Sequence, residues 1–192
     1  MSGARRLVLL GPPGAGKGTQ AVRLCADLGL PQVSTGELFR RQKAEGTELG
    51  LLAASYMDRG EYVPDEVTDA VVERRLAETD ARDGFLLDGY PRTLAQVEAL
   101  DAMLRDSGHG LDLVLNITAP IEEVVDRLLG RAQQEGRADD TEEVIRRRLE
   151  VYEEETAPLV DVYRSRAILR DIDGLGDVYE VAARIRAVVD AG

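Results

Sequence analysis

A glycine-rich segment near the start of the chain carries the residues best suited to bind phosphate. Residues 11–19 read Gly-Pro-Pro-Gly-Ala-Gly-Lys-Gly-Thr, and glycines at this spacing let backbone N–H groups turn inward around an anion. Lys17 is placed to reach the outer phosphates of a nucleoside triphosphate. An apolar run at 7–10 precedes the segment, and residues 20–28 follow it with helical apolar spacing. This order of strand, loop and helix predicts a phosphate-binding P-loop.

The end of the P-loop departs from the general pattern. The pattern has Ser or Thr directly after the lysine as a magnesium ligand, but here Gly18 follows Lys17 and Thr19 comes next. This variant resembles the nucleoside monophosphate kinases more than GTPases or motor ATPases. Asp88 closes a second apolar run, where P-loop enzymes keep the acid that positions magnesium. A simple turn or helix cap is the alternative for Asp88.

Several arginines are spaced so that they could surround a transferred phosphoryl group. Arg92 follows Asp88 after a short turn, and Arg127 and Arg131 are four residues apart, on one face of a helix. Arg137 lies in a polar stretch, 132–140, that reads as an exposed loop, and Arg148 lies on the next helix. The two helical arginines alone could merely complement the helix dipole. Together, the set looks like a lid over phosphates.

The rest of the chain alternates strands and helices, which positions these residues at one edge of a sheet. Strands are expected at 7–10, 32–34, 84–88, 111–117 and 167–172, with a helix in each connection and another from 178 to the end. The helix that begins at 121 is expected to end near 130, and Pro158 is expected to kink a long helix from 141. This alternation predicts an α/β fold with a parallel sheet covered on both faces, and ligands bind such sheets at the carboxyl ends of strands.

Composition and charge limit the class of protein. The chain has 192 residues, a net charge of −12, one cysteine and one histidine. Such an acidic chain is not expected to bind nucleic acid, and no apolar run is long enough for a membrane span or a signal peptide. A zinc site of the Cys/His type is not expected, and Cys25 is expected to be a buried, inert thiol. These observations favour a cytoplasmic protein of one domain.

Five motifs in one order make the chain similar to the adenylate kinases, a group of nucleoside monophosphate kinases, over nearly its whole length. The motifs are 11–20 (Gly-Pro-Pro-Gly-Ala-Gly-Lys-Gly-Thr-Gln), 34–40 (Ser-Thr-Gly-Glu-Leu-Phe-Arg), 84–93 (Gly-Phe-Leu-Leu-Asp-Gly-Tyr-Pro-Arg-Thr), 126–131 (Asp-Arg-Leu-Leu-Gly-Arg) and 137–140 (Arg-Ala-Asp-Asp) followed by Arg148. The resemblance implies a P-loop three-layer fold with a five-stranded parallel sheet in one domain, 1–192. Residues 34–63 would form a helical monophosphate-binding flap, and 130–140 would form the short lid of the short-lid members.

The resemblance also implies a reaction, MgATP + AMP ⇌ 2 ADP, and a role for each matching residue. Asp88 would hold Mg²⁺ through water, with no zinc, and the protein would be a monomer. The catalytic residues would be Lys17, Arg92, Arg127, Arg131, Arg137 and Arg148. ATP would contact Gly14, Ala15, Gly16, Lys17, Gly18, Thr19, Arg127, Arg131 and Gly176. AMP would contact Thr35, Gly36, Arg40, Glu61, Tyr62, Val63, Gly89, Tyr90, Pro91, Arg92, Gln96, Arg137 and Arg148.

Two positions depart from the family pattern, and they leave the expected contacts in place. Tyr90 stands where Phe is usual, a change that keeps the ring, and Glu61 stands where Lys is common, at a backbone contact. For the choice of base, the amide of Gln96 offers a donor and an acceptor to adenine, and Thr35 a further hydroxyl contact.

Three other functions are alternatives to adenylate kinase activity. A UMP/CMP kinase tends to carry Ala in place of Thr35, so the sequence favours AMP. A non-catalytic nucleotide sensor is the second alternative, and the presence of Lys17, Asp88, Arg92 and the lid arginines together argues against it. A GTPase needs Asn-Lys-x-Asp, but Asn116 is followed by Ile117.

Overall fold

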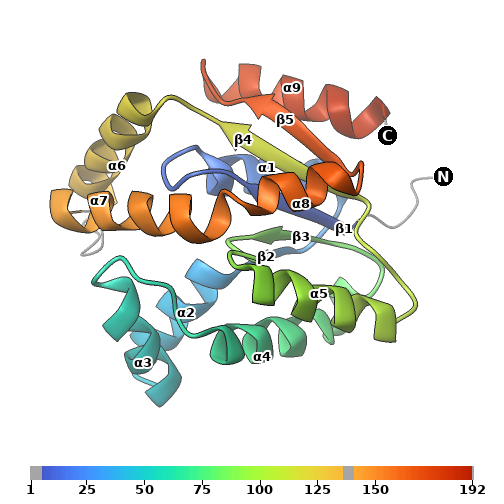
Figure 1. Ribbon diagram of the computed structural model, residues 1–192, viewed down its shortest axis with the longest axis horizontal. Coiled ribbons are helices and arrows are strands. Elements are labelled where there is room, and N and C mark those ends of the chain that lie inside the picture. The colour runs from blue at the N-terminus through green and yellow to red at the C-terminus, as the bar shows by residue number, and fades with distance from the viewer. Residues whose placement is uncertain (1–5, 136–140, 192) are drawn as a thin grey trace.

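A parallel five-stranded sheet forms the centre of the computed structural model, in the strand order β2-β3-β1-β4-β5 (Figure 1). The structure describes residues 6–135 and 141–191, and for 131–135 the backbone only. The strands are β1 (Arg6–Leu10), β2 (Gln32–Ser34), β3 (Phe85–Asp88), β4 (Leu113–Thr118) and β5 (Leu169–Asp173). Every strand pair is parallel. The α/β fold predicted from the sequence is therefore confirmed.

Helices connect the strands and cover both faces of the sheet (Figure 1). The helices are α1 (Lys17–Leu28), α2 (Thr35–Ala44), α3 (Glu48–Met57), α4 (Asp65–Leu76), α5 (Leu94–Asp106), α6 (Ile121–Glu135), α7 (Glu142–Val151), α8 (Leu159–Ser165) and α9 (Val178–Ala191). A 3₁₀ turn (Thr79–Ala81) precedes β3, and a π-helical turn (Tyr152–Thr156) joins α7 to α8.

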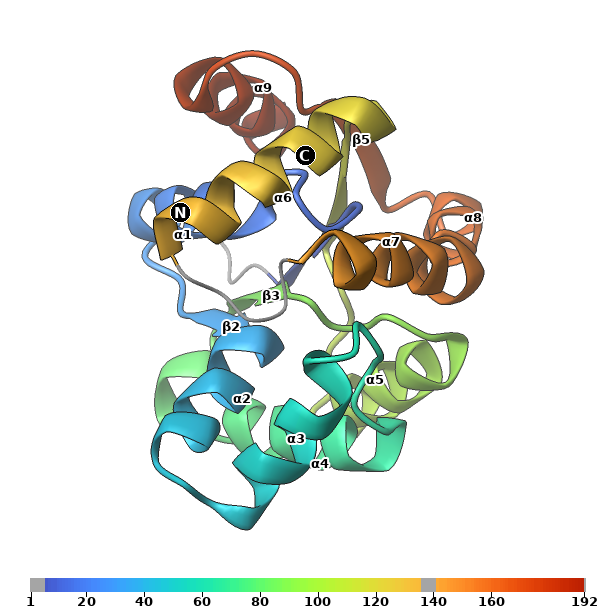
Figure 2. The same cartoon turned by 90° about the vertical axis from the view of Figure 1, so that its left-hand side faces the viewer.

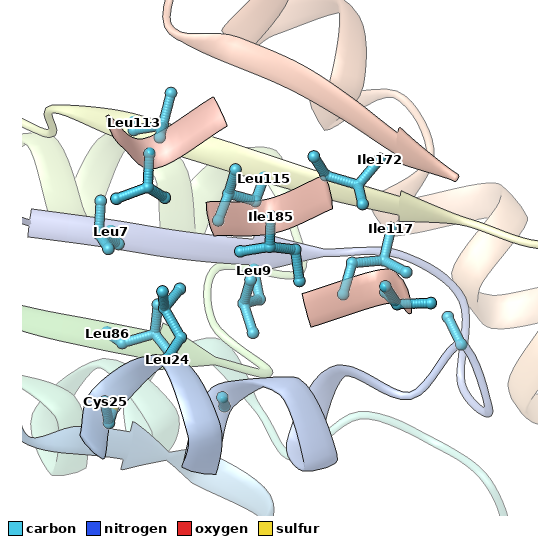
Figure 3. Close-up of a cluster of buried hydrophobic side chains, with 14 residues drawn as sticks. Leu7, Leu9, Leu24, Cys25, Leu86, Leu113, Leu115, Ile117, Ile172 and Ile185 are labelled. Carbon is cyan, nitrogen blue, oxygen red and sulfur yellow. The ribbon is translucent and has the colours of Figure 1, made fainter. Parts of the chain in front are cut away.

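The sheet separates two hydrophobic clusters because successive side chains of a strand point to opposite faces. Leu7 and Leu9 of β1 pack with α1 and α9, in the cluster that includes Leu24 and Ile185 (Figure 3). Val8 and Leu10 face the other side, with apolar residues of α4, α5 and α8. The central strand is thus buried on both faces, and this rigid layer fixes the loops that leave its carboxyl end.

A separate small cluster stabilises the segment between β2 and α4. Phe39 of α2, Ala53 of α3 and Val63 pack together away from the sheet. Figure 2 shows α2 and α3 on one side of the molecule and α6 and α7 on the other. The segment predicted as a flap, 34–63, therefore has its own apolar contacts and stands opposite the helices that flank the predicted lid.

The strands expected at 111–117 and 167–172 begin two residues later and end one residue later than predicted, and two helices differ more. Helix α6 does not end near 130 but continues to Glu135, so the expectation of an exposed loop is wrong for 132–135. Residues 136–140, with Arg137, lie outside the described residues. The long helix from 141 is interrupted as expected near Pro158, but by the π-helical turn that comes just before the proline.

Candidate active site

A cleft with a volume of about 720 Å³ opens at the carboxyl ends of β1 and β3. The P-loop, the β2–α2 junction, the segment before α4, the turn after β3, α6 and α7 all contribute to its walls. Most residues predicted from the sequence line this cleft: Gly14, Gly16, Lys17, Gly18, Thr19, Gly36, Arg40, Glu61, Tyr62, Asp88, Gly89, Pro91, Arg92, Arg127 and Arg148. A smaller cavity beside it brings in Thr35, Val63 and Gln96.

A few predicted residues do not line either space. Ala15 and Tyr90 are buried, at 2% and 1% exposure, and Gly176 lies in the loop between β5 and α9. Only the backbone of Arg131 is described, and Arg137 lies outside the described residues. These positions therefore stay predictions.

The P-loop backbone is folded so that only glycine fits at its turns. Gly11, Gly14 and Gly16 have φ values of 137°, 86° and 90°, which side chains rarely adopt. A Cβ on Gly14 would lie 2.8 Å from the Leu128 side chain of α6. Lys17 donates from Nζ to the carbonyls of Gly11 (2.7 Å) and of Pro12 (2.8 Å), so the ammonium lies over the loop. Because α1 begins at Lys17, the positive end of its dipole faces the same space.

Asp88, at the end of β3, lies beside the first turn of α1. A Cβ built on Gly18 would be 3.7 Å from Asp88 Oδ2, so the absence of a side chain at 18 leaves room in front of the carboxylate. Asp88 and Thr19 both line the cleft, and carboxylate and hydroxyl oxygens are hard ligands of the kind Mg²⁺ takes. Behind them, burial and the charge of Asp88 raise the pKa of Cys25 to about 11. The prediction that the Cys25 thiol is buried is confirmed, and the raised pKa disfavours the reactive thiolate.

The turn after β3 is tied to elements on both sides of the cleft. The carbonyl of Gly89 accepts hydrogen bonds from Thr35 Oγ1 and from Arg92 Nε, each at 2.8 Å. The Arg92 guanidinium lies over the Tyr62 ring, 4.9 Å from its centre. Thr156 donates its single hydroxyl proton to the Arg92 carbonyl at 2.8 Å. The Tyr62 hydroxyl lies 2.7 Å from Thr156 Oγ1, and because that proton is already used, Tyr62 is the donor of this second hydrogen bond. Arg92 is thereby fixed at its backbone and at its guanidinium.

Gln96 is held by the protein more tightly than the sequence indicates. It is 1% exposed. Its Oε1 accepts a hydrogen bond from the Arg92 backbone N–H and its Nε2 donates one to Asp65 Oδ1, both at 2.7 Å.

The Tyr90 side chain is also bonded inside the protein, because its hydroxyl donates to Asp69 Oδ1 at 2.7 Å. Burial, and to a smaller extent this hydrogen bond, raise the pKa of Tyr90. The hydroxyl that distinguishes Tyr90 from Phe therefore has a partner.

Arg127 of the cleft is positioned by a carboxylate and a backbone carbonyl, and Arg147, outside the cleft, binds Glu61. Arg127 donates from Nε to Glu123 Oε1 (2.9 Å) and from Nη2 to the carbonyl of Gly174 (3.2 Å). Glu61, expected to act through its backbone, turns its carboxylate to Arg147 Nε of α7 at 2.7 Å. The bond from Arg147 lowers the pKa of Glu61, so its charge is largely offset beside the cleft.

Sequence reasoning missed Asp65, Asp69 and Thr156. The two aspartates lie one turn apart on α4, and that spacing was the available signal. It was weak, because the same helix carries further acidic residues that are exposed. Thr156 gave no signal, since its partner Arg92 is 64 residues away in the chain.

Comparisons with known proteins agree with the geometry. The sequence model of a family described as adenylate kinase matches residues 9–168. A protein of a Nocardioides species named adenylate kinase is 57% identical over 185 residues, 96% of this chain and 97% of its own. Proteins of the same name from Thermobifida fusca and Mycobacteroides abscessus are 58% and 56% identical over 179 residues, 93% of this chain and 95% and 96% of their own.

Proposed function

Because this chain belongs to the adenylate kinase family, we propose that it transfers a phosphoryl group reversibly from MgATP to AMP, giving two ADP. One observation carries the proposal: a single cleft has a P-loop on one side and the Arg92 turn with the 34–63 segment on the other. Two phosphate-binding regions that face one space suit a reaction in which the phosphates of two nucleotides meet.

On the donor side, ATP binds with its phosphates in the P-loop. The backbone N–H groups of 14–19 and the dipole of α1 hold the β- and γ-phosphates. Lys17 exchanges its two loop carbonyls for phosphate oxygens, where charge shifts during transfer. Arg127 and Arg131 of α6 bind the same phosphates, and Gly176 lies near the adenine.

On the acceptor side, AMP binds between the flap and the turn after β3. Its phosphate lies against Arg40 and Arg92, and its base enters the smaller cavity lined by Thr35, Val63 and Gln96. A phosphate oxygen of AMP attacks the γ-phosphorus of ATP, an O–P bond forms, and the bond to the leaving ADP breaks. Arg137 and Arg148 balance the charge on the transferred group.

Magnesium is the metal that fits the oxygens near Asp88. Asp88 would hold the ion through water, with Thr19 nearby, and the ion would neutralise charge on the phosphates. Among the described residues no three His, Cys, Asp or Glu side chains gather into a metal site. The proposal includes no zinc because Cys25 and His109 are the only cysteine and histidine of the chain. No helix in the described parts of the chain is long and apolar enough to cross a membrane.

We also propose a monomer that acts in the cytoplasm on ATP, AMP and ADP. No observation of the structure favours a UMP/CMP kinase or a nucleotide sensor.

The function is tested by assaying ADP formation from MgATP with AMP, CMP, UMP and GMP in parallel. AMP is expected to exceed CMP and UMP in kcat/KM by about a hundredfold, since a buried amide left unpaired by the wrong base costs about 1–3 kcal/mol for each lost bond. Removing Mg²⁺ with a chelator should stop the reaction. Equal rates with CMP or UMP would overturn the adenylate assignment.

A further inference from the structure

Asp65 of α4 lies behind the smaller cavity and does not belong to the predicted site. Its two carboxylate oxygens accept one hydrogen bond each: Oδ1 from Gln96 Nε2 at 2.7 Å and Oδ2 from Thr93 Oγ1 at 2.9 Å. Thr93 in turn caps α5 by accepting from the Gln96 backbone N–H at 3.1 Å. One carboxylate thus holds both the first turn of α5 and the side chain that this turn carries.

The chemistry of the two partners fixes which end of the Gln96 amide points where. A carboxylate only accepts, so the group facing Asp65 must be the NH₂, and a backbone N–H only donates, so the group facing Arg92 must be the oxygen. An amide has two N–H donors and an oxygen that accepts twice. After these two bonds, one donor and one acceptor are left.

We propose that Asp65 is a positioning residue for base recognition: it fixes the Gln96 amide so that one donor and one acceptor together meet the edge of the acceptor base. Adenine presents an acceptor and a donor side by side on such an edge, and this pairing matches what Gln96 has left. Without Asp65 the NH₂ group loses its anchor, and the amide is held only by the bond from the Arg92 backbone N–H to its oxygen. The inference rests on the proposed function and explains how its base preference is set.

The experiment compares Asp65→Ala with Glu66→Ala. Both residues lie in the first turn of α4 and both changes remove one negative charge, but Glu66 is exposed. Asp65→Ala is expected to raise the KM for AMP about tenfold and to lower the AMP-to-UMP ratio of kcat/KM by a similar factor, because uracil presents its donor and acceptor in the reverse order to adenine. The kcat, the KM for ATP and the Glu66→Ala enzyme should stay close to wild type.

Two further variants separate positioning from a general structural effect. Asp65→Asn should restore most of the AMP affinity, because its carbonyl can accept from Gln96 while its NH₂ donates to the Thr93 hydroxyl. In a Gln96→Leu background, Asp65→Ala should add little to the KM for AMP, since the Gln96 amide that Asp65 orders is already absent. If thermal melting shows that Asp65→Ala is unfolded, Asp65→Ser takes its place.

Different results would refute the role of Asp65 and the proposed function on which that role rests. If wild type shows no preference for AMP, the proposed function fails. If wild type prefers AMP, Gln96→Leu loses the preference and folded Asp65→Ala keeps it, the role of Asp65 alone is refuted. Equal effects of Asp65→Ala with and without Gln96, or an Asp65→Asn enzyme no better than Asp65→Ala, would also refute it.

Discussion

Lys17 and Lys43 are the only lysines of the chain, and their surroundings differ in a way that predicts their importance. Lys17 lies over the P-loop with its Nζ on two carbonyls, whereas Lys43 forms an exposed ion pair with Asp58 at 3.0 Å. Exposed pairs contribute little to stability, but a fixed charge where transition-state charge develops contributes much more.

Replacing Lys17 by Met should therefore lower kcat by about 10²–10³, while the fold is kept. Lys43→Met is the matched control and should leave kcat close to wild type. Steady-state rates of ADP formation and thermal melts of both variants measure this. A Lys17→Met enzyme with more than about a tenth of wild-type kcat would contradict the role given to this lysine.

Tyr62 contacts Arg92 with its ring and Thr156 with its hydroxyl, so two substitutions separate the two contacts. Tyr62→Leu removes the ring, which holds the guanidinium by about 0.5–1 kcal/mol, and should raise the KM for AMP two- to fivefold, roughly the same energy. Tyr62→Phe keeps the ring and should leave that KM nearly unchanged, while the lost hydrogen bond lowers the free energy of unfolding by about 0.5–1.5 kcal/mol. The reverse pattern in kinetics and urea unfolding would show that the hydroxyl positions Arg92.

At the scale of elements, α2 and α3 approach so closely that one glycine is required. A Cβ built on Gly50 of α3 would lie 2.1 Å from the Gln42 carbonyl carbon of α2, and backbone atoms cannot yield as a side-chain end can. Gly50→Ala should therefore destabilise the protein by about 1–3 kcal/mol, despite the better helix propensity of Ala.

Ser55→Ala, an exposed change on the same helix, is the control and should shift the melting temperature little. The segment predicted as a flap, 34–63, carries the predicted AMP contacts Arg40 and Tyr62, so Gly50→Ala should also raise the KM for AMP. An unchanged melting temperature for Gly50→Ala would mean that the two helices can separate without cost.

The elements show what the sequence could predict and what it could not. The predicted positions of all five strands overlap the observed ones, most directly for β1, β3 and β4, which are short and almost entirely buried runs. Apolar periodicity failed at 131–135, where Arg-Ala-Gln-Gln-Glu shows no apolar stripe although its residues favour a helix. The P-loop and Arg92 were predictable since each motif is local in the chain. Asp65 was not, because its partners Thr93 and Gln96 are 28 and 31 residues away.

The whole molecule combines a net charge of −12 with a cleft lined by cations. Lys17, Arg40, Arg92, Arg127 and Arg148 all reach that cleft. Salt screens charges over about 8 Å at physiological ionic strength, so acidic groups on distant surfaces do not cancel the local field. Polyphosphate binding by an acidic protein therefore depends on where the cations lie and not on their total number.

Three buried tyrosines predict how the whole fold responds to alkali. Burial raises the pKa of Tyr152 to about 12 and, more strongly, the pKa values of Tyr90 and Tyr163. In the unfolded chain each titrates near its ordinary pKa of about 10. Above pH 10 the unfolded state therefore binds fewer protons than the native state, so stability is complete below pH 10 and falls as pH rises toward the native pKa values.

The free energy of unfolding should thus drop by up to about 4 kcal/mol between pH 8 and pH 11, or about 1.4 kcal/mol for each tyrosine. Tyr163 provides the test, because its buried hydroxyl has no hydrogen-bond partner among the described residues. Tyr163→Phe should leave the free energy of unfolding at pH 8 unchanged or slightly higher, and it should reduce the loss of that free energy at alkaline pH by about a third.

Tyr179→Phe is the control, because the Tyr179 side chain is 70% exposed, and it should leave the alkaline loss of unfolding free energy unchanged. Urea unfolding at pH 8 and pH 11 measures all three proteins, and equal losses in wild type and Tyr163→Phe would show that Tyr163 ionises in the native state as readily as in the unfolded chain.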